Sequence, residues 1–228
     1  MPVIALEEKY TGFTVSKQAV NEGLIAIGGN LSVNTLIGAY SEGIFPWFTK
    51  DEPIFWWSPD PRIILIPEKF NISHSLKQRV RSQKFEVSSD RNFKSVIENC
   101  ARINRKDQDD TWITKDIIKA YTALHKAGYA HSFETWFNGE LVGGLYGVSL
   151  GRAFFGESMF HSETDASKVA FHALVQFALK HNFYFIDAQM KTNHLTSLGA
   201  EGIPRVEFRQ ILKTALEWPT IKGKWTLD

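Results

Sequence analysis

The segment Phe183–Gln189 is typical of a buried strand that ends in polar side chains. Side chains alternate along a strand, so Asp187 and Gln189 are expected on one face. Glu157 stands in a similar place, directly after the apolar run Ala153–Gly156. A carboxylate among apolar neighbours needs a hydrogen-bond or charge partner. We therefore expect these three polar residues at the carboxyl edge of a sheet, where α/β proteins present functional groups. The alternative is that both acids are merely caps or loop residues.

Aromatic and proline residues crowd the segment 44–62, which contains three of the seven tryptophans of the chain. Flat rings held in a proline-rich backbone suit stacking on a nucleobase, worth about 1–3 kcal/mol per base in single-stranded recognition. The alternative is a loop that packs its own aromatic side chains into a small core.

A locally basic stretch follows. Residues 62–84 contain six basic residues and one acid, although the whole chain carries a net charge of only +1. Such segregation of charge suits a phosphate backbone, and a solvated surface helix is the alternative. The basic residues expected to contact RNA are Arg62, Lys77, Arg79, Arg81 and Lys84.

Composition and missing motifs exclude several classes of protein. The 228 residues, 43% hydrophobic and 22% charged, are typical of a globular chain. One cysteine, Cys100, precludes an intramolecular disulfide and indicates a reducing compartment. Apolar runs fall far short of the roughly 18 residues of a membrane span, and the first ten residues lack the basic flank of a secretory signal. No P-loop, zinc-protease or paired-cysteine motif occurs, so we expect no metal and no cofactor. The single cysteine and the lack of a secretory signal lead us to expect a cytoplasmic location.

The predicted helices and strands follow a recognisable order. Ser32, Asp90 and Thr114 are expected to cap helices, and Gly43 to end the first of them. The order from there is helix 114–128, strands 130–137 and 141–149 joined by Asn138-Gly139, strand 152–159, helix 165–180, strand 183–189 and a last helix opened by Pro204. This order resembles the acyl-CoA N-acyltransferase-like (GNAT-like) fold, of α/β (α+β) class. We expect a small N-terminal domain over 1–85 and a GNAT-like catalytic domain over 86–228.

Five motifs spread along the chain are closely similar to those of the bacterial leucyl/phenylalanyl-tRNA–protein transferases. They are Gly43-Ile44-Phe45-Pro46-Trp47-Phe48, Trp56-Trp57-Ser58-Pro59-Asp60-Pro61-Arg62, Thr111-Trp112-Ile113-Thr114, Gly156-Glu157-Ser158-Met159-Phe160 and Ser197-Leu198-Gly199-Ala200. The resemblance implies an enzyme that moves leucine or phenylalanine, and methionine less well, from tRNA onto the α-amine of proteins starting with arginine or lysine. Such a modification would mark the acceptor for N-degron degradation.

The resemblance also implies a role for each candidate residue. Asp187 and Gln189 would carry the chemistry, with Gln189 accepting a hydrogen bond from the attacking amine and Asp187 polarising it. Trp47 and Trp112 would flank the 3′ adenosine of the tRNA. The pocket for the aminoacyl side chain would be lined by Leu145, Phe154, Glu157, Phe171, Leu174 and Ile186. The implied partners are aminoacyl-tRNA and an acceptor protein, for an enzyme that acts as a monomer without a cofactor or membrane.

Three other functions stay open at this point. A CoA-dependent N-acyltransferase would fit the fold, but residues 160–166 lack a pyrophosphate-binding loop and contain two acids, Glu163 and Asp165. A non-catalytic RNA-binding protein would explain the tryptophans and the basic stretch, but not a strand ending in Asp187 and Gln189. A peptidoglycan-type transferase that uses aminoacyl-tRNA is the third.

Overall fold

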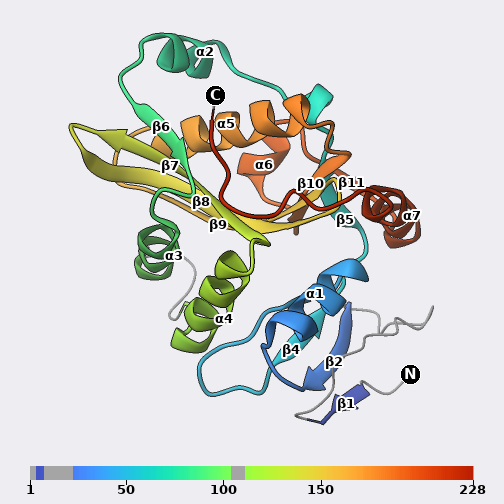
Figure 1. The fold of residues 1–228 in the computed structure, drawn as a ribbon. Helices are drawn as coiled ribbons and strands as arrows, with labels where there is room; N and C mark the ends of the chain where they lie inside the picture. The colour runs from blue at the N-terminus through green and yellow to red at the C-terminus, as the bar shows by residue number, and fades with distance from the viewer. Residues whose placement is uncertain (1–3, 8–22, 104–110, 228) are drawn as a thin grey trace.

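The computed structural model describes residues 4–7, 23–103 and 111–227. Most of the N-terminal stretch from which we predict the absence of a secretory signal lies outside these described residues. The described chain forms two sheets of unequal size (Figure 1). None of its helices combines the length and the apolar character that crossing a membrane requires.

The smaller sheet has four strands in the order β1-β2-β4-β3. Its strands are β1 (Ile4–Leu6), β2 (Leu24–Gly28), β3 (Phe45–Pro46) and β4 (Phe55–Trp57). Between β2 and β3 lies α1 (Val33–Ser41), whose N-cap Ser32 accepts a hydrogen bond from a backbone N–H of the first turn. The chain turns away at Gly43, whose φ of 74° is readily adopted only by glycine. Both ends of this helix agree with the prediction.

The larger sheet has seven strands in the order β11-β5-β10-β9-β8-β7-β6. Strands β7, β8 and β9 form an antiparallel meander, whereas β9 and β10 are parallel. Parallel strands need a long crossover, and α5 (Ala166–Lys180) supplies it. The strands are β5 (Arg62–Leu65), β6 (Glu86–Ser89), β7 (Ala130–Phe137), β8 (Glu140–Leu150), β9 (Ala153–His161), β10 (Phe185–Gln189) and β11 (Glu201–Ile203).

Helices cover both faces of the larger sheet (Figure 1). One face packs against α5, and the other against α3 (Phe93–Arg102) and α4 (Lys115–Lys126). The remaining helices are η1 (Pro67–Lys69), α2 (His74–Arg81), α6 (Asn193–Ser197) and α7 (Arg205–Leu216). The predicted order of elements is confirmed, as is the mixed α/β class with a small N-terminal part and a larger C-terminal part.

The domain boundary expected at residue 85 differs from the sheet topology. β5 begins at residue 62 and lies inside the larger sheet, between β11 and β10. α2 packs on α5 above that sheet. Residues 62–85 therefore belong with the larger part, and the division between the sheets lies between Trp57 and Arg62. A short apolar strand does not reveal from its own sequence which sheet it joins.

The helix expected to begin at Asp90 begins later, and its cap is Asn92. Asp90 is buried instead. Its carboxylate accepts hydrogen bonds from the backbone N–H groups of Ser132 and Trp225 and lies 2.8 Å from Nδ1 of His131. A buried carboxylate needs partners of this kind, so Asp90 joins β7 to the C-terminal segment.

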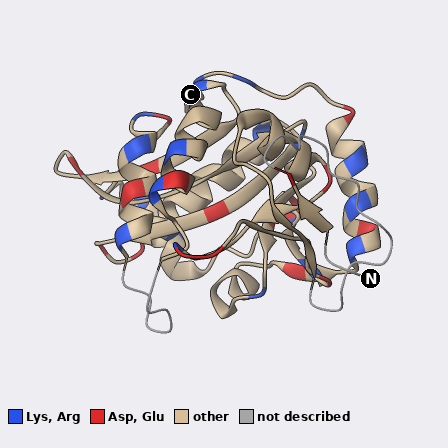
Figure 2. Cartoon of the chain, turned by 90° about the horizontal axis from the view of Figure 1, so that it is seen from below, with Lys and Arg blue, Asp and Glu red and all other residues tan. Residues whose placement is uncertain are grey.

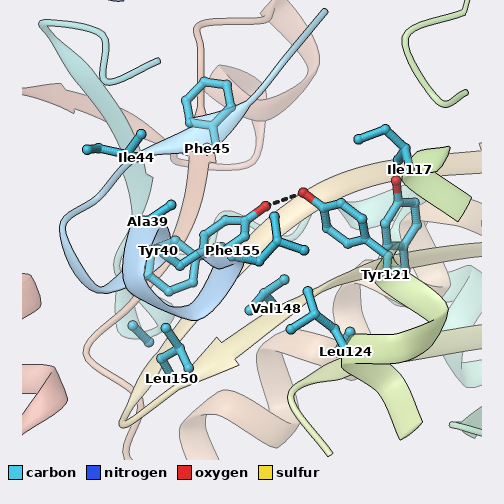
Figure 3. Packing of buried hydrophobic residues seen from close by; sticks show 14 of the residues in the cluster. Ala39, Tyr40, Ile44, Phe45, Ile117, Tyr121, Leu124, Val148, Leu150 and Phe155 are labelled. Carbon is cyan, nitrogen blue, oxygen red and sulfur yellow. Dashed lines mark hydrogen bonds between the residues drawn. The ribbon is translucent and has the colours of Figure 1, made fainter. Parts of the chain in front are cut away.

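The two parts of the chain share one hydrophobic core. Tyr40 and Ile44 of the N-terminal part pack among Val148, Leu150 and Phe155 of the larger sheet (Figure 3). The centroids of the Tyr40 and Phe155 rings are 5.1 Å apart. This packing holds α1 beside β9, the strand on which the candidate site depends.

Positions of basic and acidic residues alternate along much of the chain. Figure 2 shows Lys and Arg interspersed with Asp and Glu, for example along α7 at its right edge. This mixing agrees with the net charge of +1.

Candidate active site

β9 and β10 pair only over the first part of their length, and their pairing ends at Phe155 and Asp187. Beyond this point each strand contains one extra residue that interrupts its antiparallel ladder, Glu157 in β9 and Ala188 in β10. Bulges of this kind bend a strand and re-aim its side chains. The bulges therefore stand where the two strands cease to pair and where Glu157 and Gln189 are placed.

A cavity of about 450 Å³ opens at this position. Its wall combines a polar corner, an apolar side and two tryptophans, an arrangement suited to a small ligand with an apolar portion. Nine of the ten site residues predicted outside the basic stretch line it: Trp47, Trp112, Leu145, Glu157, Phe171, Leu174, Ile186, Asp187 and Gln189.

Phe154 is the tenth, and its expected place in the pocket wall is wrong. Phe154 lies beside Ile186 in the parallel pair of strands but has no exposed surface. Its ring packs against Phe133 and Trp225, with centroid separations of 6.4 and 6.1 Å. Phe154 thus supports the wall from behind rather than forming it.

Arg62 and Asp187 form an ion pair with no solvent exposure. The Arg62 Nε donates to Oδ1 of Asp187 at 2.9 Å, and Nη2 donates to Oδ2 at 2.6 Å. The guanidinium also lies 4.9 and 4.8 Å from the ring centroids of Phe45 and Phe208. The prediction that Arg62 contacts the tRNA backbone is therefore wrong, because a fully buried guanidinium cannot reach a phosphate.

Gln189 is oriented by both acids of the site. Its backbone N–H donates to Oδ1 of Asp187 at 2.9 Å, and its side-chain Nε2 donates to Oε1 of Glu157 at 2.8 Å. Its φ of 61° lies in a region that costs a non-glycine residue about 1–3 kcal/mol. The amide oxygen of Gln189 has no hydrogen-bond partner among the described residues, which leaves it available to a ligand at the cavity wall. Asp187 acts on Gln189 through the backbone and not through the side-chain amide.

Glu157 is surrounded by hydrogen-bond donors. Tyr40 donates to Oε1 at 2.6 Å and Tyr121 to Oε2 at 3.2 Å. The two tyrosine hydroxyls also lie within hydrogen-bond distance of each other (Figure 3), and because they carry only two protons, all three contacts are hydrogen bonds at once only when Glu157 is protonated and donates one. The pKa of Glu157 is raised from 4.5 to about 7. Burial is the main cause and the charge of Asp187 adds to it, while the hydrogen bonds from Tyr40, Tyr121 and Gln189 oppose the rise. Glu157 therefore changes its charge near neutral pH.

Replacing Glu157 by glutamine is expected to flatten the pH dependence of stability. With a pKa of about 7 in the folded protein and 4.5 in the unfolded chain, Glu157 stabilises the fold fully below pH 4.5, and this contribution is lost as the pH rises through about 7. Between about pH 5 and pH 8, the free energy of unfolding should fall more in the wild type than in Glu157→Gln, by up to about 3 kcal/mol. Urea titration measures this, and an equal fall in both proteins contradicts the assignment.

The tryptophans near the site divide into two groups. Trp47 of the aromatic segment and Trp112, which lies outside that segment, line the cavity and are partly exposed. Trp57 supports Trp47, since its Nε1 donates to the Trp47 carbonyl at 2.9 Å and the ring centroids are 6.1 Å apart. Trp56 is fully buried, so the small-core alternative holds for that residue.

The basic residues on and after α2 differ in their partners. Two are paired with acids near the start of α5, Arg79 with Asp165 at 3.7 Å and Lys84 with Glu163 at 3.0 Å. Lys77 and Arg81 are exposed and have no ion-pair partner in the part of the chain that the structure describes. These two remain available to an anion.

Within residues 4–7, 23–103 and 111–227, no group of three or more His, Cys, Asp and Glu side chains is placed to hold a metal ion. The turn before α5, where a pyrophosphate-binding loop would lie in a CoA-dependent enzyme, instead presents Glu163 and Asp165. Both acids are paired with cations, Glu163 with Lys84 and Asp165 with Arg79 and Lys168.

Sequence reasoning missed Tyr40 and Tyr121, and it missed the pairing of Arg62 with Asp187. Both tyrosines lie on apolar helix faces and therefore suggest core packing alone. What could have pointed to them is that a buried tyrosine hydroxyl needs a polar partner. Arg62 could have been recognised as a charged residue within an apolar strand. A buried charge of this kind requires a buried acidic partner from another segment of the chain.

Comparison with known proteins gives a consistent result. The family model "Leucyl/phenylalanyl-tRNA protein transferase" matches residues 64–213, and the model of the N-terminal domain of the same family matches residues 29–60. A leucyl/phenylalanyl-tRNA–protein transferase of Desulfatibacillum aliphaticivorans is 53% identical over 228 residues, covering 100% of this chain and 97% of the relative. One of Legionella pneumophila (strain Corby) is 50% identical over 225 residues, covering 99% of this chain and 100% of the relative.

Solved structures overlap more loosely. A GCN5-related N-acetyltransferase-like protein from Streptococcus suis is 13% identical, with a TM-score of 0.34 over 72% of this chain and 61% of that protein.

Proposed function

Because this chain belongs to the family of leucyl/phenylalanyl-tRNA–protein transferases, we propose that it transfers leucine or phenylalanine, and methionine less well, from aminoacyl-tRNA to proteins. The acceptor is the α-amine of a chain that begins with arginine or lysine, and the modified protein enters N-degron degradation. The enzyme acts in the cytoplasm as a monomer.

The observation that carries this proposal is the composition of the cavity that opens where β9 and β10 cease to pair. Trp47 and Trp112 offer flat faces to the 3′ adenosine, at which the amino acid is esterified. The apolar side of the same wall receives the aminoacyl side chain through Leu145, Phe171, Leu174 and Ile186. The polar corner of Glu157 and Gln189 adjoins both. This combination supports a transferase over a protein that only binds RNA.

The transfer replaces an ester bond by an amide bond. The α-amine of the acceptor attacks the ester carbonyl, the tetrahedral intermediate expels the ribose oxygen, and the proton released by the amine ends on that oxygen. Because the ester is already activated, the main tasks of the protein are orientation and electrostatic stabilisation. Gln189 is the catalytic residue, since its amide oxygen accepts a hydrogen bond from the amine. Asp187 and Arg62 are positioning residues that act through the backbone of Gln189.

Recognition of the positive first residue falls to Glu157. Asp187 is fully buried and committed to Arg62, so it is not available to a second cation. Glu157 lies at the cavity wall, and when ionised it attracts an arginine or lysine side chain. Tyr40 and Tyr121 hold its carboxylate in place.

The proposed function is tested by incubating the protein with radiolabelled leucyl-tRNA and peptides that differ only in their first residue. Label should pass to peptides starting with arginine or lysine and not to those starting with alanine or glutamate. Transfer to all peptides alike would contradict the acceptor specificity, and transfer to none would contradict the activity.

The apolar wall predicts a graded choice of donor. Leucine and phenylalanine should be transferred faster than isoleucine and valine from the same tRNA body, because branching at Cβ conflicts with the pocket. One methylene in such a pocket is worth about 1–3 kcal/mol, and moving a methyl group from Cγ to Cβ should have an effect of the same order, or about 10- to 200-fold in kcat/KM. Single-turnover rates with misacylated tRNA measure the difference, and equal rates for leucine and isoleucine would contradict the pocket.

A further inference from the structure

Two lysines, Lys168 and Lys191, stand close in the chain to residues of the cavity wall and have no part in the proposed transfer step. Lys191 stands between Met190 and Thr192, both in the cavity wall. It is exposed, and it has no hydrogen-bond or ion-pair partner within the residues that the structure describes. Lys168, in the first turn of α5, is 42% exposed.

His194 connects these lysines to the cavity. Its side chain lines the cavity wall from α6. Burial lowers the pKa of His194, and the nearby charges of Lys168 and His161 lower it further. Lys168 stands one turn of α5 before Phe171, which lines the cavity, so it lies on the same side of the helix as the cavity wall.

Asp165 links the mouth to α2. Its Oδ1 lies 3.0 Å from Nζ of Lys168, and its Oδ2 lies 3.7 Å from Nε of Arg79 on α2. One carboxylate thus holds cations from two helices together. The exposed residues Lys77 and Arg81 add two cations on α2, which packs against α5, and we call them together with Lys168 and Lys191 the basic track.

We infer that Lys168 and Lys191 bind the internucleotide phosphates of the unpaired 3′ end of the donor RNA, between the contacts of the tRNA body on α2 and the adenosine at Trp47 and Trp112. This inference rests on the proposed function and adds the path of the donor strand. Lysine binds a phosphate as a point charge, and a single strand offers one phosphate per nucleotide. An acceptor with a positive first residue would be repelled by the same lysines, so the track suits RNA and not the acceptor.

Donors of increasing length test this path. Leucyl-adenosine carries no internucleotide phosphate, a leucylated CCA trinucleotide carries only those of the 3′ end, and leucyl-tRNA adds the body. The variants are Lys168→Gln with Lys191→Gln at the mouth and Lys77→Gln with Arg81→Gln on α2. The matched control is Lys213→Gln, which changes an exposed lysine of α7, away from the basic track.

The mouth variant (Lys168→Gln with Lys191→Gln) should raise KM both for the leucylated trinucleotide and for leucyl-tRNA. The α2 variant (Lys77→Gln with Arg81→Gln) should raise KM for leucyl-tRNA alone. The slope of log affinity against log salt should decrease in magnitude by about 0.7 for each phosphate that a removed lysine had neutralised. KM for leucyl-adenosine should move no more than in the control.

Three results would overturn the inference. The first is a trinucleotide that binds the mouth variant with the KM and salt slope of the control. The second is an equal weakening of all donors, including leucyl-adenosine, which would place the effect in the pocket. The third is a change in the KM of the acceptor peptide alone, which would place the acceptor on this track. Failure of the proposed function is distinguishable, because the wild-type protein would then transfer leucine from none of the donors.

Discussion

Asp187→Asn is expected to lower the free energy of unfolding by about 3–5 kcal/mol, because it leaves the buried guanidinium of Arg62 without its counter-charge. The same change should lower kcat for leucyl transfer while leaving the KM of the donor nearly unchanged, since loss of the ion pair with Arg62 disturbs the strand end at which Asp187 accepts a hydrogen bond from the backbone N–H of Gln189. Urea unfolding and single-turnover transfer measure the two effects separately.

Two further variants make this result specific. Glu201→Gln breaks the exposed pair with Lys69, so it should cost less than about 1 kcal/mol. Replacing the buried pair by apolar residues, Arg62→Met with Asp187→Leu, should recover much of the stability but not the rate. Wild-type stability of Asp187→Asn would show that the buried pair does not hold the strands, and a wild-type rate would show that it does not position Gln189.

Gln189→Ala should lower kcat about 10²-fold or more with little change in stability. The attacking amine then has no acceptor to orient it, and a misplacement of about 1 Å can cost about 10²-fold in rate. The donor should bind with nearly the wild-type affinity, because the tryptophans and the apolar wall are intact. Single-turnover rates with leucyl-adenosine isolate the chemical step from binding of the tRNA body.

The matched control for this variant is Gln210→Ala, which changes an exposed glutamine of α7. It should leave both kcat and KM at their wild-type values. A Gln189→Ala protein with a raised donor KM and an unchanged kcat would make Gln189 a binding residue only, and the proposed catalytic role would then be wrong.

The polar corner depends on both parts of the chain. Tyr40 comes from α1 in the N-terminal part, whereas Tyr121 comes from α4, and both donate to the one carboxylate of Glu157. The pKa of this carboxylate near 7 is thus set by packing between the two parts. The N-terminal part contributes directly to the electrostatics of the site, besides presenting Trp47.

Local signals in the sequence determined most elements. The N-caps Ser32 and Thr114 and the Asn138-Gly139 turn act on their immediate neighbours, so their effect can be read without knowledge of the rest of the fold. The polar residues Asp187 and Gln189 at the end of an apolar strand also pointed to the site, and the family motifs supplied the expected roles.

Only the tertiary structure decided which residues reach the cavity. Every residue of β5 is buried, so its sequence shows no alternation from which the direction of Arg62 could be derived. Its partner Asp187 lies 125 residues away in the chain. Phe154 and Ile186 are neighbours in the sheet, yet only Ile186 reaches the cavity wall. Such differences arise from the packing of distant strands and helices against one another, and no local pattern of residues encodes them.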